Sequence, residues 1–165
     1  MTGCIEKPRR SRESGNAMLE FGLVFVPLFA IIFAISDFSM AIFMRATLQQ
    51  AVREGVRYAV TYQTMSGLCQ DASIKQVVKT ASSGFLTSAN DAIIFVRYHA
   101  PNDLTTVVTG AGSNAAGNIV EVSVEGYSYS WMAPIARSNT PLSITVTAAD
   151  RNESLPQGTT TPPCR

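Results

Sequence analysis

The sequence is poor in charge and in the residues that catalytic and metal sites use most. Of its 165 residues, 15% are charged, against about 25% in ordinary soluble domains, and the formal net charge is only +1. This balance provides no basic face, so no nucleic-acid partner is expected. The single histidine, His99, excludes a site built on two histidines. The length allows one ordinary domain, or a smaller domain with an appendage, but not two large domains.

The missing charge is confined to one part of the chain. Residues 21–36 contain no charged side chain, and the apolar run extends to Met44 if Asp37 is tolerated. A helix needs about 20 apolar residues to cross the hydrocarbon of a bilayer, so this run is long enough to span it once. An excess of Lys and Arg on one flank marks the cytoplasmic side, so we expect the N-terminus inside and the bulk of the chain outside. The basic residues of that flank are Lys7, Arg9, Arg10 and Arg12.

Two residues do not suit a plain membrane anchor. Glu20 stands at the start of the apolar run and Pro27 lies inside it, and both carry a cost in a membrane helix. Taken alone, Glu20 could simply mark the headgroup boundary. Its context is more specific, because residues 15–21 read GNAMLEF, with a glycine and four further residues before Glu-Phe, directly after a short basic leader.

This arrangement resembles the type IV prepilin signal, and most closely that of the TadE-like minor pilins and pseudopilins of the tight-adherence (Flp) pilus system. The resemblance takes in Pro27, Asp37 with Phe38, and residues 51–59, AVREGVRYA, and it covers about residues 10–60. Residues 145–153 also resemble the final strand of that family. The implied fold is pilin-like, and the implied location is the inner membrane, with possible incorporation into the pilus.

In that family a prepilin peptidase cuts after the glycine on the cytoplasmic side. When the cleavage site of that family is transferred to this sequence, the resemblance implies cleavage between Gly15 and Asn16, with Glu20 and Phe21 as the fifth and sixth mature residues. It also implies that Glu20 neutralises the new terminal amine, its own or a neighbour's, as subunits leave the bilayer for a filament. The implied partners are the prepilin peptidase, other minor pilins and pseudopilins, the major Flp pilin, the inner-membrane assembly platform and the lipid bilayer.

Two other interpretations stay open. Residues 34–36, AIS, followed by Asp37 could form a signal-peptidase site that releases a secreted protein. Against this, the signal would exceed the usual length of about 15–30 residues, and apolar residues resume immediately afterwards. The chain could also be a membrane-anchored binding or sensory domain that keeps its leader.

Beyond the apolar run, the periodicity predicts an α+β domain on a helical stalk. Residues 45–62 repeat apolar side chains at i, i+3, i+4 and i+7, and residues 71–83 do so again, with Asp71 as a possible N-cap and Gly84 as terminator. From residue 92 the period becomes two, which predicts an antiparallel sheet of three or four strands packed on the stalk or the second helix. The predicted strands are centred on residues 94–98, 120–124 and 142–146, and residues 105–109 could form a fourth strand. The expected parts are a leader at 1–15, a transmembrane helix at 16–44, a helical stalk at 45–62, an extracytoplasmic domain at 63–155 and a tail at 156–165.

Three smaller features of this domain carry expectations of their own. Tyr127, Tyr129 and Trp131 stand at odd-numbered positions, as do Glu121 and Glu125, so a regular strand would place all five side chains on one face. Either Gly126 marks a bulge that turns the aromatic side chains into the core, or they form an exposed strip. Residues 110–115 satisfy G-x-G-x-x-A, but no helix follows, so we expect a hairpin loop and no nucleotide site. His99, at a strand end, is expected to be a surface or capping residue.

The three cysteines divide between the two sides of the membrane. Cys4 belongs to the leader, whereas Cys69 and Cys164 both lie outside, where disulfides persist, so we expect these two to form a bridge. Free or intermolecular thiols are the alternative. The chain shows no nucleophile paired with a base, no metal-ligand spacing and no phosphate loop, so we expect no enzyme activity, no cofactor and no metal.

Overall fold

The computed structural model describes residues 13–131 and 141–165. Most of the leader, including Cys4 and the basic residues Lys7, Arg9, Arg10 and Arg12, therefore lies outside the described residues. The elements, in chain order, are α1 (Glu13–Val60), α2 (Gln70–Ala81), a 3-10 helix η1 (Ser88–Ile93), β1 (Ile94–Ala100), β2 (Asp103–Val107), β3 (Ile119–Tyr129) and β4 (Leu142–Arg151).

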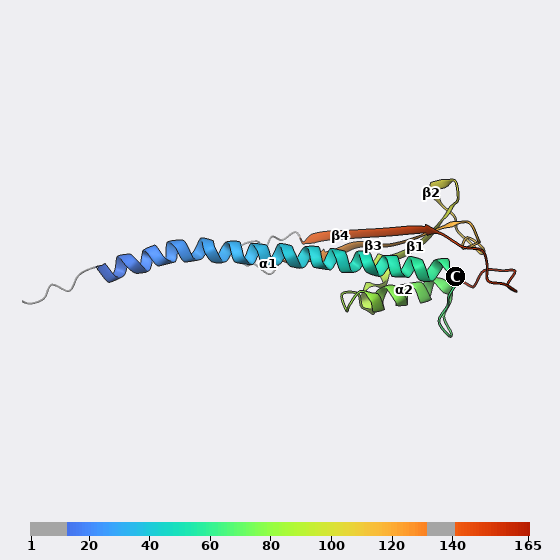
Figure 1. Ribbon diagram of the computed structural model, residues 1–165, viewed down its shortest axis with the longest axis horizontal. Coiled ribbons are helices and arrows are strands. Elements are labelled where there is room, and N and C mark those ends of the chain that lie inside the picture. The colour runs from blue at the N-terminus through green and yellow to red at the C-terminus, as the bar shows by residue number, and fades with distance from the viewer. Residues whose placement is uncertain (1–12, 132–140) are drawn as a thin grey trace, which may run out of the picture.

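The helix α1 is unbroken and contains both the predicted membrane run and the predicted stalk. It has 48 residues and continues through Pro27. Figure 1 shows the first half of α1 extending away from the rest of the protein, whereas the second half runs alongside the sheet and α2. Burial along the helix begins at Asp37, so the membrane run and the domain share one rod.

The four strands form one antiparallel sheet in the order β2-β1-β3-β4. This confirms the predicted α+β fold, with β2 as the fourth strand. Because β1 lies between β2 and β3, the connection that contains residues 110–115 passes the end of β1. The expectation of a hairpin loop there is wrong, although the residues do form turns, with Gly110 and Gly112 at positive φ.

The two helices pack on one face of the sheet, α1 against β3 and β4 and α2 against β1. They are in close contact at Gly55, where an added Cβ would lie 2.5 Å from Val78 Cγ2 on α2 and 3.6 Å from Val122 Cγ1 on β3. Burial of apolar area drives this packing, and glycine lets three elements meet at one point. The core of the domain includes Ala41, Met44, Leu48, Ala51, Val52, Val56, Ala59, Ile74, Val78, Ile94, Tyr98, Val120, Val122, Val124, Ile144 and Val146.

A bulge in β3 decides where the aromatic residues lie. The pairing of β3 with β4 shifts register between Val124 and Tyr127, at Gly126, whose φ is 71°. The extra residue moves Tyr129 to the helix side of the sheet, where only 6% of it is exposed, and Trp131 packs edge-on against it with ring centroids 5.7 Å apart. The core interpretation of these aromatics is confirmed for Tyr129.

The second helix begins one residue earlier than predicted. Its N-cap is Cys69, which makes no side-chain capping bond, so the prediction of Asp71 as N-cap is wrong. The carboxylate of Asp71 instead accepts hydrogen bonds from the Tyr98 hydroxyl at 3.0 Å and from Arg165 Nε at 3.0 Å. The carboxylate of Asp71 therefore bonds to residues distant in sequence and does not cap the helix.

Candidate functional site

The N-terminal half of α1 presents apolar side chains on all sides. None of residues 16–36 is buried, and most of them are apolar. Within the described ranges, α1 is the one helix long and apolar enough to cross a membrane, over Asn16–Val60. A helix that is hydrophobic all round and exposed requires an apolar solvent or an apolar partner.

Four phenylalanines form a ladder along this exposed half. Phe21, Phe25, Phe29 and Phe33 follow each other at intervals of four, and neighbouring ring centroids lie 5.0, 4.2 and 6.1 Å apart. Rings at i and i+4 contact each other on a helix surface, which stiffens the segment around Pro27. The helix continues through Pro27, although the proline cannot donate one backbone hydrogen bond of the helix.

The predicted processing and assembly residues lie on the first turns of α1. Gly15 and Asn16 are both helical, and Glu20 and Phe21 are exposed. Asn16 and Glu20 are four residues apart, so they share a face and are separated by about 6 Å along the axis. The structure therefore places the carboxylate of Glu20 one turn from the backbone nitrogen that cleavage after Gly15 would convert into an amine.

Asp37 marks the point where α1 meets the domain. Only 2% of it is exposed, and its Oδ1 accepts a hydrogen bond from the hydroxyl of Tyr129 at 3.2 Å. Burial, and then this hydrogen bond, raises the pKa of Tyr129. A carboxyl group that faces lipid is costly, so its cover by the domain would stabilise this part of α1 in a bilayer.

Asp37 is a packing residue that the sequence did not predict, although the sequence contains a signal for it. Asp37 shares its helix face with the buried Ala41, Met44 and Leu48, at spacings of four, seven and eleven. An acid on the buried stripe of an amphipathic helix requires a polar partner. That partner, Tyr129, lies 92 residues away in sequence, and its orientation depends on the β3 bulge.

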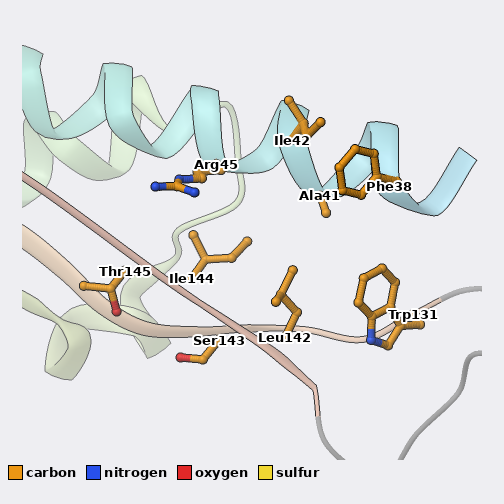
Figure 2. A pocket seen from close by; sticks show the side chains of 9 residues that line it. All are labelled: Phe38, Ala41, Ile42, Arg45, Trp131, Leu142, Ser143, Ile144 and Thr145. Carbon is orange, nitrogen blue, oxygen red and sulfur yellow. The ribbon is translucent and has the colours of Figure 1, made fainter. Parts of the chain in front are cut away.

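A cleft opens beside this junction, between α1 and the beginning of β4. Its volume is about 510 Å³, and Figure 2 shows Trp131 and Leu142 facing Phe38 and Ala41 across it, with Arg45 further along the helix. Most of the residues that line it are apolar. Its remaining lining residues are Ile42, Ser143, Ile144 and Thr145.

At the opposite end of α1, the C-terminal segment is tied to the start of α2. Cys69 and Cys164 form a disulfide, and the amide of Gln70 donates to the carbonyl of Cys164 at 2.7 Å. Arg165 pairs with Asp71 at 3.0 Å, and its guanidinium lies 4.5 Å from the centroid of the Tyr98 ring. The end of the chain is therefore packed on the domain.

The outer face of the sheet carries a network of charged side chains. Arg97 pairs with Glu121 and Glu125, and His99 Nε2 lies 3.0 Å from Glu121 Oε2. The hydrogen bond from Arg97, opposed in part by burial, lowers the pKa of Glu125. His99 is only 4% exposed, so the expectation of a surface residue is wrong: pairing of β2 with β1 at this position covers the ring. These groups satisfy one another and present no nucleophile with a base.

In the part of the chain that the structure describes, no three His, Cys, Asp or Glu side chains gather in a way that could hold a metal ion. What does stand out is an α+β domain built on the outer half of a long apolar helix. This architecture defines the class: a protein with one membrane-spanning-capable N-terminal helix and a small packed domain at its far end.

Comparison with known protein families finds a match for one segment of the chain. Residues 15–57 match the family model described as TadE-like protein, which confirms the resemblance and identifies this segment as TadE-like. The matched range starts at Gly15 and ends within the packed half of α1, so it covers the helix and not the sheet. The match associates the chain with the tight-adherence pilus system. No curated protein and no solved structure matches it.

Proposed function

We propose that this protein is a TadE-like minor pilin or pseudopilin that prepilin peptidase cuts after Gly15 and that acts in the biogenesis of a tight-adherence pilus. The observation that carries the proposal is the continuity of α1. One helix holds the family segment, an exposed apolar half and the packing face of the domain. A subunit built in this way can be anchored in a bilayer and still present a folded domain outside.

The geometry of the first turns supports a role for Glu20 after cleavage. A new amine at Asn16 would stand at the positive end of the helix dipole, which is unfavourable for a cation. A carboxylate one turn away on the same face offsets that charge, and the same carboxylate can reach the amine of an adjacent subunit. Pairing of this kind lets both charges leave water together.

The geometry also argues against release of a secreted protein by cleavage before Asp37. The helix runs without interruption through Ser36 and Asp37, and Ser36 Oγ donates to the Ile32 carbonyl at 2.9 Å. Cleavage there would create an amine directly beside a carboxylate that is already buried against Tyr129. The domain would also lose the helix that precedes its packing face.

The proposed orientation places the basic leader in the cytoplasm and the α+β domain outside the inner membrane. The disulfide between Cys69 and Cys164 supports this, because such bonds persist in oxidising compartments. The proposed partners are the peptidase, the other minor pilins, the major pilin, the assembly platform and the bilayer itself.

Replacement of Gly15 tests the processing step. The variant Gly15→Leu should keep its leader, because a branched side chain obstructs the peptidase site, and N-terminal sequencing should find the original terminus. The matched control is Gly22→Leu on the same helix, where an added Cβ would meet no atom within 4 Å, and this variant should be cut normally. A Gly15→Leu protein with the mature size and normal pilus assembly would exclude prepilin processing and favour a membrane-anchored binding domain that keeps its leader.

A further inference from the structure

Among the described residues, several at the end of the domain nearest the exposed half of α1 are apolar and exposed. Phe38, Ile42 and Phe43 are 63, 54 and 56% exposed, Leu142 is 37% exposed, and Trp131 is half-buried beside them. We call these five residues the proximal patch. They come from α1, from just after the end of β3 and from the start of β4. Four of them, Phe38, Ile42, Trp131 and Leu142, line the cleft of about 510 Å³ in Figure 2, together with Ala41, Arg45, Ser143, Ile144 and Thr145.

We infer that the proximal patch lies in the outer interface of the bilayer and that the cleft takes a phospholipid acyl chain, with Arg45 at the lipid phosphate. This inference rests on the membrane anchoring in the proposed function and goes beyond it, since an anchored domain need not touch lipid. The occupant is a phospholipid of the leaflet that faces the domain.

The length of the helix supports this placement. If Glu20 marks the inner boundary, about 20 helical residues at about 1.5 Å each span a hydrocarbon layer of about 30 Å. Counted from Phe21, the outer edge of the hydrocarbon then falls near Met40. Asp37 lies inside that edge, and the structure covers it with Tyr129 from the domain. The end of the sheet must therefore reach into the outer leaflet with it.

The chemistry of the patch fits an interface between lipid and water. Tryptophan and other aromatic side chains concentrate at headgroup level, where one end of the ring is in an apolar medium and the other is wet. Arg45 lies five residues beyond Met40, about 7 Å further along the axis, and the headgroup layer is about 5–8 Å thick on each side. Its guanidinium can pair with a phosphate while its stem lies along apolar side chains.

Trp131 provides the test, because it is the only tryptophan in the chain. The full-length protein is reconstituted into phosphatidylcholine vesicles with and without phosphatidylglycerol, and insertion is verified by resistance to alkaline extraction. Lipids brominated near the headgroup should lower Trp131 emission at least about twofold, whereas a water-soluble quencher should have little effect. The matched control is Trp131→Phe with Leu104→Trp, which moves the fluorophore to an exposed position of β2, outside the cleft. That probe should respond to the water-soluble quencher alone.

Each result has a distinct meaning. An inserted protein whose Trp131 responds only to the water-soluble quencher overturns the lipid site and leaves anchoring intact. Protection of Trp131 that appears only when other pilins are present also overturns it and makes the patch a protein interface. Removal of the protein from the vesicles by alkaline extraction overturns both the lipid site and the anchoring.

The variant Arg45→Gln tests the assignment of Arg45 to the lipid phosphate. Loss of the additional quenching seen with anionic lipid supports this assignment, and unchanged quenching overturns it.

Discussion

Gly55 of α1 faces Val78 of α2 so closely that a β-carbon on Gly55 would lie 2.5 Å from Val78 Cγ2. This contact sets the distance between the two helices, and its glycine belongs to the TadE-like segment. Val78 is fully buried and β-branched, and a β-branched side chain in a helix strongly prefers one rotamer, so its methyl group resists displacement.

The variant Gly55→Ala should therefore destabilise the domain. Overpacking of a filled core costs about 1–3 kcal/mol, whereas the gain in helix propensity is only about 1 kcal/mol, so the net loss should be about 1 kcal/mol. Chemical denaturation of the full chain in detergent measures it. Gly22→Ala, on the same helix and without neighbours, provides the matched control and should not lower stability. Equal or higher stability of Gly55→Ala would show that the helices can separate without cost.

The hydrogen bond between Tyr129 and Asp37 should contribute measurably to the junction. Removal of the hydroxyl in Tyr129→Phe deletes the hydrogen bond to Asp37 Oδ1, and such bonds contribute about 0.5–1.5 kcal/mol. We expect a loss in this range in the denaturation free energy. Tyr127→Phe, at a neighbouring half-buried tyrosine of the same strand, is the control. If both variants unfold at the same denaturant concentration, the bond makes no contribution.

Stability should fall in alkaline solution because three tyrosines have raised pKa values. Burial is the largest cause for Tyr62, Tyr98 and Tyr129, and the charge of Asp71 adds to it at Tyr98. Above the ordinary tyrosine pKa of about 10, the unfolded chain loses these protons while the folded chain keeps them. The stabilisation is therefore fully present below pH 10 and is lost as the pH rises through the folded pKa values. Unfolding midpoints between pH 8 and pH 11 should show this fall, and Tyr98→Phe should make it shallower.

The disulfide between Cys69 and Cys164 should be a major source of stability. It closes a loop with a sequence separation of 95, for which chain entropy predicts about 4–5 kcal/mol. Intact mass without reductant should be two hydrogens below the reduced mass, and the double variant Cys69→Ser, Cys164→Ser should unfold at a much lower temperature. Cys4→Ser should leave both measurements unchanged. A full complement of free thiols in the purified protein would rule out the bridge.

The carboxylate of Glu20 should matter for assembly and not for cleavage. In Glu20→Gln the amide cannot neutralise the amine of Asn16, and an uncompensated buried charge costs about 3–5 kcal/mol, enough to reduce assembly about a hundredfold. N-terminal sequencing should still find Asn16 as the first residue, while sheared pilus fractions should be depleted. Glu54→Gln, an exposed acid further along the same helix, should assemble normally. Normal pili from Glu20→Gln would remove the assigned role.

Periodicity in the sequence predicted most of the fold because it reports burial directly. The spacing of residues 45–62 and the alternation of residues 120–124 both follow from a face that turns inward, and the structure buries those faces. The bulge at Gly126 is one of two alternatives, because alternation along the strand alone does not show whether the aromatic side chains after Gly126 turn into the core or form an exposed strip. Pairing with β4 decides between them.

What the sequence could not provide are contacts between residues far apart in the chain. Asp71 has the local signature of an N-cap, but its carboxylate pairs with Tyr98 and Arg165, which become neighbours only after the chain has folded. His99 was misplaced for the same reason, because the strand that covers it is short and mostly exposed, with weak alternation. The position of Asp37 against Tyr129 likewise depends on the completed sheet.

The continuity of α1 has a mechanical consequence. The described part of the helix has no break between the apolar half and the residues that pack against β3, β4 and α2, so any axial pull or twist on the first half is transmitted directly to the core. Because the rod runs alongside the sheet in Figure 1, a pull along its axis loads the packed interface in shear across many side chains at once. Withdrawal of the helix from a bilayer would thus move the domain as one body with it.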